Sequence, residues 1–351
     1  MIAITALFPC ISGSSSAGAQ GCMPIRYTSP ALGSQAASAP MTHVWRLAVS
    51  YRWLYADQFF VGRDYRPASA PGGQPSRINV NTIGLNLSYS PTSRLNLSLG
   101  VPVSVGTHSR LQGDSIRRQL KTGGLGDVSL VGTMWLFEPN DHPKGNLAFG
   151  LGVKAPTGQS HADGVWHTSS GAERRPIDPS IQLGDGGWAG IVRLEAFRQV
   201  MKRTAVYVAG SYLANPRENI DATFTTPYGV VAPVAVTDEY SAHGGLTFDA
   251  IPRRGLALSI GGRIDGVPVR DLIGGGDDSF RRPGYVVYVE PAVALRLSRS
   301  PVSPNGNSLS LSIPIRIAQN RLPSALEIAN DRAGGGDFAK FLIFLGYTIR
   351  L

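Results

Sequence analysis

The chain has 351 residues, of which 42% are hydrophobic and only 16% are charged, and its net charge is +9. A soluble globular protein usually carries about 25% charged residues. No run of about 18 apolar residues exists that could cross a membrane as a helix, so a closed barrel of strands is the only form in which the chain could span one. The Lys and Arg residues are scattered without a dense basic run, and we therefore predict no nucleic-acid partner.

The N-terminal 42 residues differ from the rest of the chain. Residues 2–11 form a short apolar stretch, and the small residues 17–19 offer a cleavage site of the secretory kind. No basic segment precedes the apolar stretch, so either the true start lies upstream or this segment is not a signal. We predict that residues 1–22 are a truncated signal peptide, that residues 23–42 are a periplasmic tail or a lumenal plug, and that one barrel covers residues 43–351.

Strands of alternating polarity are predicted from residue 43 to the end. The clearest is RLNLSLGVPVSVG at 94–106, where Leu or Val fills every second position and small or polar residues fill the others. Because successive side chains of a strand point to opposite faces, one face is aliphatic and the other is small and polar. The predicted strands lie at 43–55, 81–89, 94–106, 127–137, 146–156, 188–200, 204–213, 238–250, 255–265, 284–297, 308–317 and 338–351.

The connections between these strands alternate between long and short. Long connections are predicted at 56–77, 106–123, 157–178, 214–237, 268–282 and 319–337, and short ones at 90–93, 138–145, 201–203, 251–254 and 298–307. Long extracellular loops and short periplasmic turns are typical of an outer-membrane meander, whereas a soluble sandwich has no reason to alternate in this way. We predict an all-β fold, a transmembrane up-and-down antiparallel β-barrel of about twelve strands, with both chain ends on the periplasmic side.

Aromatic residues gather near the ends of the predicted strands. Trp45, Tyr89, Trp135 and Tyr347 are examples, and amphipathic rings favour the two membrane interfaces. We therefore expect aromatic girdles around the barrel, although ordinary core aromatics would give a similar pattern in a soluble protein.

Four prolines interrupt or end the predicted strands. They are Pro102, Pro156, Pro291 and Pro314. Each removes a donor from the hydrogen-bond ladder, so we expect bulges or kinks at these places.

The charged residues of the strands fall on the small, polar face. A charge that faces lipid costs about 2–4 kcal/mol for Arg or Lys at the midplane, so these residues are expected to face the lumen. The predicted lumen-lining residues are Arg46, Arg52, Asp127, Lys154, Arg193, Glu195, Arg263, Glu290, Arg296, Arg316 and Lys340. Cations outnumber anions in this set, which favours an interior that attracts anions; the alternative is that the charges pair across the lumen and fill it.

Two stretches resemble a known family. GLGDVSLVGTMWLF at 124–137 and LAFGLGVKAPTG at 147–158 are similar to the outer-membrane channel family associated with meta-pathway phenol degradation, the MetA-type transporters, and IQLGDGGW at 181–188 is similar to its later glycine-rich segment. The residues that match are Gly124, Gly126, Asp127, Pro156, Thr157 and Gly158. The resemblance covers the middle of the chain, and it implies an outer-membrane β-barrel that passes small hydrophobic or aromatic compounds.

Catalytic and metal motifs are missing from the body of the chain. Both cysteines, Cys10 and Cys22, lie in the N-terminal stretch, which excludes a disulfide framework and a cysteine metal site from the predicted barrel. His161 and His167 share one long loop, but their spacing matches no regular ligand pattern. We predict no metal, no cofactor and no enzymatic activity.

The predicted function is an outer-membrane channel for passive uptake of small hydrophobic or aromatic compounds. Its partners would be outer-membrane lipid, a small-molecule solute and the barrel-assembly machinery during biogenesis. One alternative is a lipase-like barrel hydrolase that uses His243 and the nearby Ser241. The other is a pore-free structural barrel, because about eight strands give a filled interior and 16–18 give an open channel, and long loops or residues 23–42 could plug the bore.

Overall fold

The alternating segments form one antiparallel sheet that closes on itself. In this computed structural model the described residues are 42–168, 171–225, 230–297 and 307–351. The predicted signal peptide at 1–22 and all but the last residue of the predicted tail or plug at 23–42 lie outside them. The last strand, β19 (Gly335–Arg350), pairs with the first, β1 (Val44–Val61), over most of their length, so the sheet has no free edge there.

Twelve antiparallel strands surround the bore in the described residues. Two of them are interrupted, so each is given by two segments, β5 with β6 and β17 with β18. Besides β1 and β19, the segments are β3 (Arg77–Ser90), β4 (Leu95–Leu111), β5 (Arg117–Leu125), β6 (Val128–Trp135), β7 (Gly145–Ala155), β10 (Ala189–Met201), β11 (Thr204–Ala214), β14 (Glu239–Ile251), β15 (Leu256–Val267), β16 (Gly284–Arg296), β17 (Ser308–Ser312) and β18 (Ile315–Arg321).

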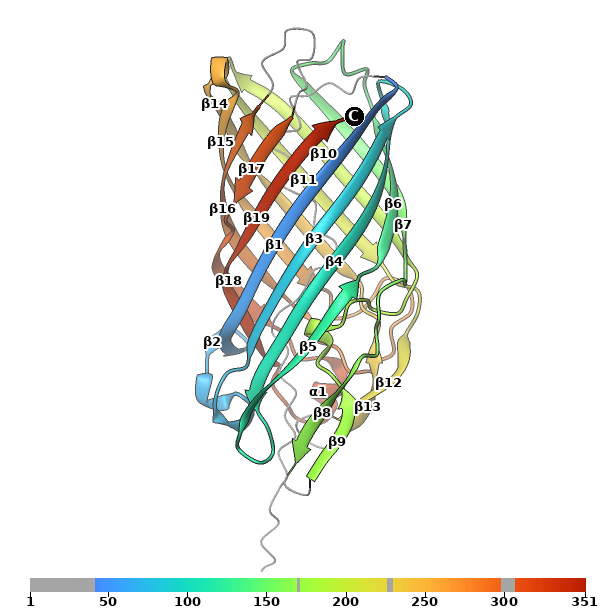
Figure 1. Ribbon diagram of the computed structural model, residues 1–351, viewed down its shortest axis with the longest axis vertical. Helices are drawn as coiled ribbons and strands as arrows, with labels where there is room; N and C mark the ends of the chain where they lie inside the picture. The colour runs from blue at the N-terminus through green and yellow to red at the C-terminus, as the bar shows by residue number, and fades with distance from the viewer. Residues whose placement is uncertain (1–41, 169–170, 226–229, 298–306) are drawn as a thin grey trace, which may run out of the picture.

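The remaining elements belong mostly to the long loops. They are β2 (Asp64–Tyr65), η2 (Pro67–Ser69), η3 (Pro71–Gly73), the hairpin β8 (Asp163–Thr168) and β9 (Gly171–Pro176), η4 (Pro179–Ile181), the hairpin β12 (Asn219–Thr225) and β13 (Val231–Ala235), η5 (Pro252–Arg254) and α1 (Ala325–Ala329). None of the described helices is long and apolar enough to cross a membrane. Figure 1 shows tilted strands around the bore, with the C-terminus at the end opposite β8, β9 and α1.

Each predicted strand coincides with a strand of the barrel, which confirms the predicted fold class. The strands are longer than predicted at the loop end: β1 continues to Val61 and β4 to Leu111, and β5 occupies part of the loop predicted at 106–123. The ladders continue past the apolar stretch because each neighbouring strand still offers hydrogen-bond partners there. Gly and Pro therefore mark the tips of the loops rather than the ends of the strands.

The aliphatic face of the strands points away from the bore. On β4, Leu97 and Leu99 are 41% and 40% exposed, whereas Ser98 between them is 7% exposed. The same alternation places large apolar side chains outside on the other strands, among them Leu130, Leu151, Leu194, Val208, Leu246 and Ile260. A belt of apolar side chains around a closed sheet is the surface that a lipid bilayer requires.

This orientation predicts opposite outcomes for adjacent substitutions. Leu99→Arg places a charge in the lipid-facing belt and should reduce the free energy of folding into lipid vesicles by about 2–4 kcal/mol. Ser98→Arg places the same charge in the bore and should cost much less. The measurement is a urea titration of folding into vesicles for both variants, and equal losses would contradict the outward orientation of Leu99.

The prolines inside the wall lie opposite the two interruptions. Pro102 of β4 faces the gap between β5 and β6, where the Gly126 amide donates to its carbonyl at 2.8 Å. Pro291 of β16 faces the gap between β17 and β18, where the Ile313 amide donates to its carbonyl at 3.1 Å. Because proline cannot donate, the neighbouring strand loses one ladder partner there and leaves the sheet for about two residues. Pro314 lies in the second gap itself, so the strand is interrupted at the place predicted for this proline.

Aromatic rings mark the rim at the end that holds the C-terminus, with one departure from the prediction. Trp45 and Tyr89, on adjacent strands, stack with ring centroids 4.6 Å apart, and Trp45 is exposed. Trp135 was also expected in a girdle, but it lines the cavity inside the barrel and packs edge-on against Phe197. Its position follows from the alternation, since Met134 next to it is exposed.

Candidate functional site

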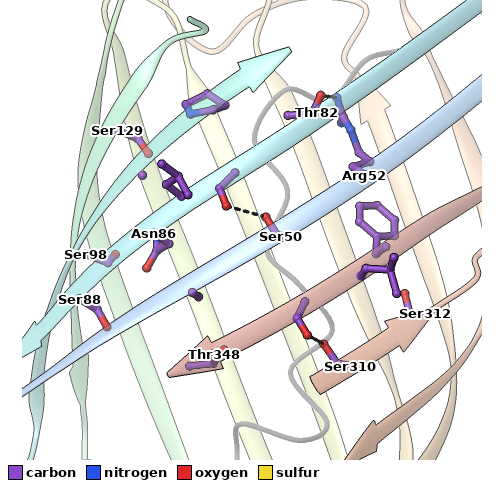
Figure 2. Close-up of a pocket in the computed structure, with 18 of the residues that line it drawn as sticks. Ser50, Arg52, Thr82, Asn86, Ser88, Ser98, Ser129, Ser310, Ser312 and Thr348 are labelled. Atoms are coloured by element: carbon purple, nitrogen blue, oxygen red, sulfur yellow. Dashed lines mark hydrogen bonds between the residues drawn. The ribbon is translucent and has the colours of Figure 1, made fainter. Parts of the chain in front are cut away.

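The barrel encloses a cavity of about 450 Å³ that reaches the end holding the C-terminus. Its wall combines small polar side chains, which alternate with the outward belt, with charged and apolar residues. Figure 2 shows ten of the lining residues: Ser50, Arg52, Thr82, Asn86, Ser88, Ser98, Ser129, Ser310, Ser312 and Thr348. Hydroxyl and amide groups replace the hydrogen bonds of water, so this wall suits a hydrated bore.

A long loop closes the cavity at the end opposite the C-terminus. We call residues 156–188 the inner loop, because several of its apolar side chains are buried against the inner face of the barrel wall. Ile177 and Ile181 are almost fully buried in a cluster with Ile78 and Leu342 of the wall. A Cβ at Gly106 would lie 2.9 Å from the Cβ of Ile181, so glycine at this wall position makes room for η4.

Three of the residues in the motifs of the resemblance meet where the inner loop joins the wall. Lys154 Nζ donates to Asp127 at 3.1 Å, to the Asp185 carboxylate and to the Gly187 carbonyl at 3.0 Å. The side chains of Lys154 and Asp127 are only 4% and 3% exposed. We call Asp127, Lys154 and Asp185 the latch. A buried lysine that donates all three protons and faces two carboxylates is a satisfied charge cluster.

Thr157 satisfies two backbone groups at the gap between β5 and β6. Its hydroxyl donates to the Gly126 carbonyl at 2.7 Å and accepts from the Val128 amide at 2.9 Å. The Gly158 amide donates to Asp127 at 2.9 Å. A Cβ at Gly184 would lie 2.5 Å from the Gly158 carbonyl oxygen, so the two backbone segments approach closely only because this residue is glycine.

Seven of the eleven predicted lumen residues line the cavity. They are Arg46, Arg52, Asp127, Lys154, Arg193, Glu195 and Arg296. Arg193 and Glu195 lie within 3.8 Å of each other on the same strand face. Together with the latch, this contact pairs part of the predicted set along one strand or between neighbouring strands, and not across the lumen as the alternative from the sequence supposed.

The other four predicted residues are placed differently. Arg263 and Glu290 are buried directly behind the lining of the cavity. The Arg263 guanidinium lies over the Phe344 ring at 5.1 Å, and Glu290 accepts a hydrogen bond from the Ser312 hydroxyl at 2.7 Å. Arg316 is half-buried, donates to Gln58 and lies over the Phe60 ring at 4.5 Å.

Lys340 departs from the prediction because the alternation breaks at this point. Ala339 pairs with Ala56 and Leu342 with Leu54, so two residues of β19 face the single Tyr55 of β1. Such a β-bulge turns the following side chains by one position. Lys340 is therefore exposed, while Leu342 takes the buried position.

The residues considered for a hydrolase do not form a nucleophile–base pair. The Ser241 hydroxyl donates to Asp265 at 2.8 Å, and His243 Nδ1 lies 3.7 Å from Glu290. The serine is thus held by a different carboxylate from the one beside the histidine. The described residues contain no group of three or more His, Cys, Asp or Glu that could hold a metal ion.

A second polar cluster lies where the inner loop meets the wall, at the end away from the C-terminus. Asp337 is fully buried at the start of β19, beyond the apolar belt, and Asp178 of the inner loop is buried near Arg282. Burial, and then the negative charge of Asp178, raises the pKa of Asp337 to about 7. Between about pH 4 and pH 7, the folded protein therefore keeps a proton on Asp337 that the unfolded chain has already released.

This pKa predicts a loss of stability as pH rises from about 4 to 7. Below that window Asp337 is protonated in both states, and above it the buried carboxylate must be charged. We expect Asp337→Asn to leave stability at pH 4 nearly unchanged and to raise it at pH 8 by about 2–4 kcal/mol relative to the native protein. Urea unfolding of both proteins across this range measures the difference, and parallel pH profiles would contradict it.

Several residues of the site were not singled out by charge or motif chemistry. Asp185, Phe344 and Thr82 line the cavity. Asp185 belongs to the segment 181–188, which was noted only for its resemblance to the channel family. For Phe344 and Thr82, the alternation of the strand was the one sequence feature that predicted an inward side chain.

A closed sheet of twelve strands with an apolar belt, a polar bore and long loops at one end defines an outer-membrane β-barrel. The fold is similar to that of the COG4313 outer membrane channel from Pseudomonas putida F1. The TM-score is 0.56 at 14% identity, over 89% of this chain and 97% of that chain. This likeness shows the fold.

Two further solved structures superpose less well. The CymD monoaromatic hydrocarbon channel gives a TM-score of 0.43 at 10% identity, over 92% of this chain and 93% of that one. A Pseudomonas aeruginosa FadL homologue gives 0.40 at 11% identity, over 96% of each chain. No family model and no curated protein matches the chain.

Proposed function

We propose that the protein is a passive outer-membrane channel for small hydrophobic or aromatic compounds. The observation that carries this proposal is the cavity, whose wall combines small polar, charged and apolar side chains inside an apolar belt and which reaches the end that holds the C-terminus. The hydrolase alternative loses its support because Ser241 and His243 have different partners. The similar channel from Pseudomonas putida supports the barrel as the shared framework.

Passage through this channel requires the inner loop to move. Ile181, Gln182 and Leu183 form the extracellular floor of the cavity, and the apolar cluster lies beyond them. Solute would enter from outside when the inner loop is displaced. The charged residues Arg46, Arg52, Arg193 and Glu195 would then set selectivity along the bore.

Two measurements test this proposal: ionic current through planar bilayers and solute uptake by vesicles. Purified protein, folded and inserted into planar bilayers, should give discrete current steps, and vesicles that contain it should take up small aromatic solutes faster than empty vesicles. Heat-unfolded protein is the control. Folded, inserted protein without conductance or solute flux would favour the pore-free structural barrel instead.

Three further parts of the proposal extend beyond the described residues. We propose that residues 1–22 are removed on export, that residues 23–42 are a periplasmic tail or a lumenal plug, and that the barrel-assembly machinery inserts residues 43–351 into outer-membrane lipid. The resemblance of residues 124–158 further supports membership of the channel family associated with phenol degradation. Mass spectrometry of the mature protein from outer membranes tests the cleavage, and an intact N-terminus there would reject it.

A further inference from the structure

One row of inward side chains combines hydroxyl, cationic and aromatic groups. Five adjacent strand segments, β4, β3, β1, β19 and β17, place Ser104, Thr82, Arg52, Phe344 and Ser312 directly opposite one another in register. All five side chains line the cavity. Figure 2 shows Arg52, Thr82 and Ser312 on the inner face of the wall. We call these five residues the guanidinium row.

The chemistry of the guanidinium row matches a planar acid. Arg52 Nη2 lies 3.4 Å from the Thr82 hydroxyl, which in turn lies 2.9 Å from the Ser104 hydroxyl. A guanidinium offers paired N–H donors that fit the two oxygens of a carboxylate. Phe344 stands opposite Arg52, and directly opposed side chains have Cβ atoms about 4.5–5.5 Å apart. A carboxylate on Arg52 would thus place an attached ring beside Phe344.

More positive charge follows on the same face toward the periplasm. Arg46 lies six residues before Arg52 on β1, about 20 Å along the strand at 3.3 Å per residue, and the small Ala48 and Ser50 lie between them. Arg46 is directly opposite Arg350, and both line the cavity. Like charges directly opposite each other destabilise a sheet, and an anion between them removes that cost.

The charge balance of the wall also favours an acid over a neutral solute. The described lining contains six cationic residues and four acidic ones, and three of those four carboxylates already face Lys154 or Arg193. A neutral hydrocarbon gains nothing from guanidinium and hydroxyl groups. An aromatic acid gains a charge-assisted hydrogen bond at one end and ring contact at the other.

We propose that the solutes of this channel are small aromatic carboxylates, bound by the guanidinium row and guided to the periplasm by Arg46 and Arg350. The inference rests on the proposed channel function and names its substrate class. Arg52 binds the carboxylate, Phe344 contacts the ring, and the hydroxyls of Thr82 and Ser104 border Arg52. The Ser312 hydroxyl donates to the buried Glu290, and the Arg263 guanidinium lies over the Phe344 ring, so the solute ring meets the face or edge of Phe344 that Arg263 does not cover.

The experiment measures single-channel currents in planar bilayers at pH 7, with benzoate as the probe. Under a KCl gradient, the native reversal potential should show anion preference. Added benzoate should reduce the chloride current with a saturable dependence on its concentration, whereas benzamide, its neutral isostere, and acetate, which lacks the ring, should do so at least about tenfold more weakly, which corresponds to about 1.4 kcal/mol.

Four variants separate the parts of the proposal. Arg52→Gln should weaken block by benzoate by about tenfold or more and lower the anion preference. Arg52→Lys should keep the anion preference but weaken the block, because a lysine lacks the fork geometry. Phe344→Leu should weaken block by benzoate and leave the anion preference unchanged. Lys340→Gln removes the same charge from the exposed bulge and is the matched control.

The outcomes distinguish the inference from the function on which it rests. Folded native protein that carries no current would reject the channel itself. Two results would overturn the carboxylate inference without contradicting the channel function. One is a current with no anion preference, and the other is block by benzamide as strong as block by benzoate. Equal effects of Arg52→Gln and Lys340→Gln would show that the guanidinium row is not the binding site.

Discussion

Replacing Lys154 with methionine is expected to free the inner loop and enlarge the bore. The substitution leaves the buried carboxylates of Asp127 and Asp185 without their shared cation, and breaking a buried ion pair in this way costs about 3–5 kcal/mol. The inner loop can relieve that cost by leaving the wall. We therefore expect larger single-channel currents and a lower unfolding midpoint than in the native protein.

Two controls decide whether the latch is the cause. Lys340→Met removes a lysine of the same kind from an exposed position and should change neither quantity. Adding Asp127→Asn and Asp185→Asn to the methionine variant removes the uncompensated charges and should restore much of the midpoint. Protease cleavage within residues 156–188 of the membrane-embedded protein reports the position of the inner loop. A methionine variant with native current and native cleavage would reject the latch.

Replacing Thr157 with valine is the second large effect we expect. The two residues have the same shape, but valine cannot serve the Gly126 carbonyl and the Val128 amide, which the threonine hydroxyl now satisfies. These backbone groups lie beside the exposed apolar Leu125 and Leu130, where water is scarce. Two unsatisfied groups there should lower the free energy of unfolding by about 2–5 kcal/mol.

Serine at the same position is the matched control. Thr157→Ser keeps the hydroxyl and should stay within about 1 kcal/mol of the native protein. Urea unfolding in vesicles measures both variants under the same conditions. If valine and serine behave alike, the backbone groups at the strand gap are satisfied by other partners, and our account of the contact between the wall and the inner loop is wrong at this position.

The guanidinium row could be predicted only in part. Arg52 was expected in the lumen because its charge falls on the polar face of its strand, and it lines the cavity. Phe344 could not be assigned beside it, because the register between β1 and β19 joins residues from the two ends of the chain. Trp135 was also assigned only in part. An aromatic ring near a strand end was expected at the membrane interface, but the in–out alternation along its strand places Trp135 on the inner face, where it lines the cavity.

The inner loop was the largest structural surprise. Residues 157–178 read as an exposed loop because they contain glycine, proline and polar residues, yet Ile177 is buried inside the barrel. The pattern of apolar residues along a segment predicts which side chains are buried. It does not predict which residues, far apart in the sequence, pack against them. The effect of the prolines was predicted, but not its exact place. Pro102 and Pro291 were expected to disturb their own strands, whereas the gaps lie in the strands that pair with them.

The sequence by itself determined the closed sheet, the number and order of its strands and the outward direction of Leu97 and its equivalents. It could do so because these properties follow from a two-residue period and from loop lengths, which are local. Only the tertiary structure decided the latch, the guanidinium row and the exposed position of Lys340. Lys154 meets Asp127 and Asp185 across 27 and 31 residues, and such contacts depend on strand register, bulges and the path of the inner loop, which no local period records.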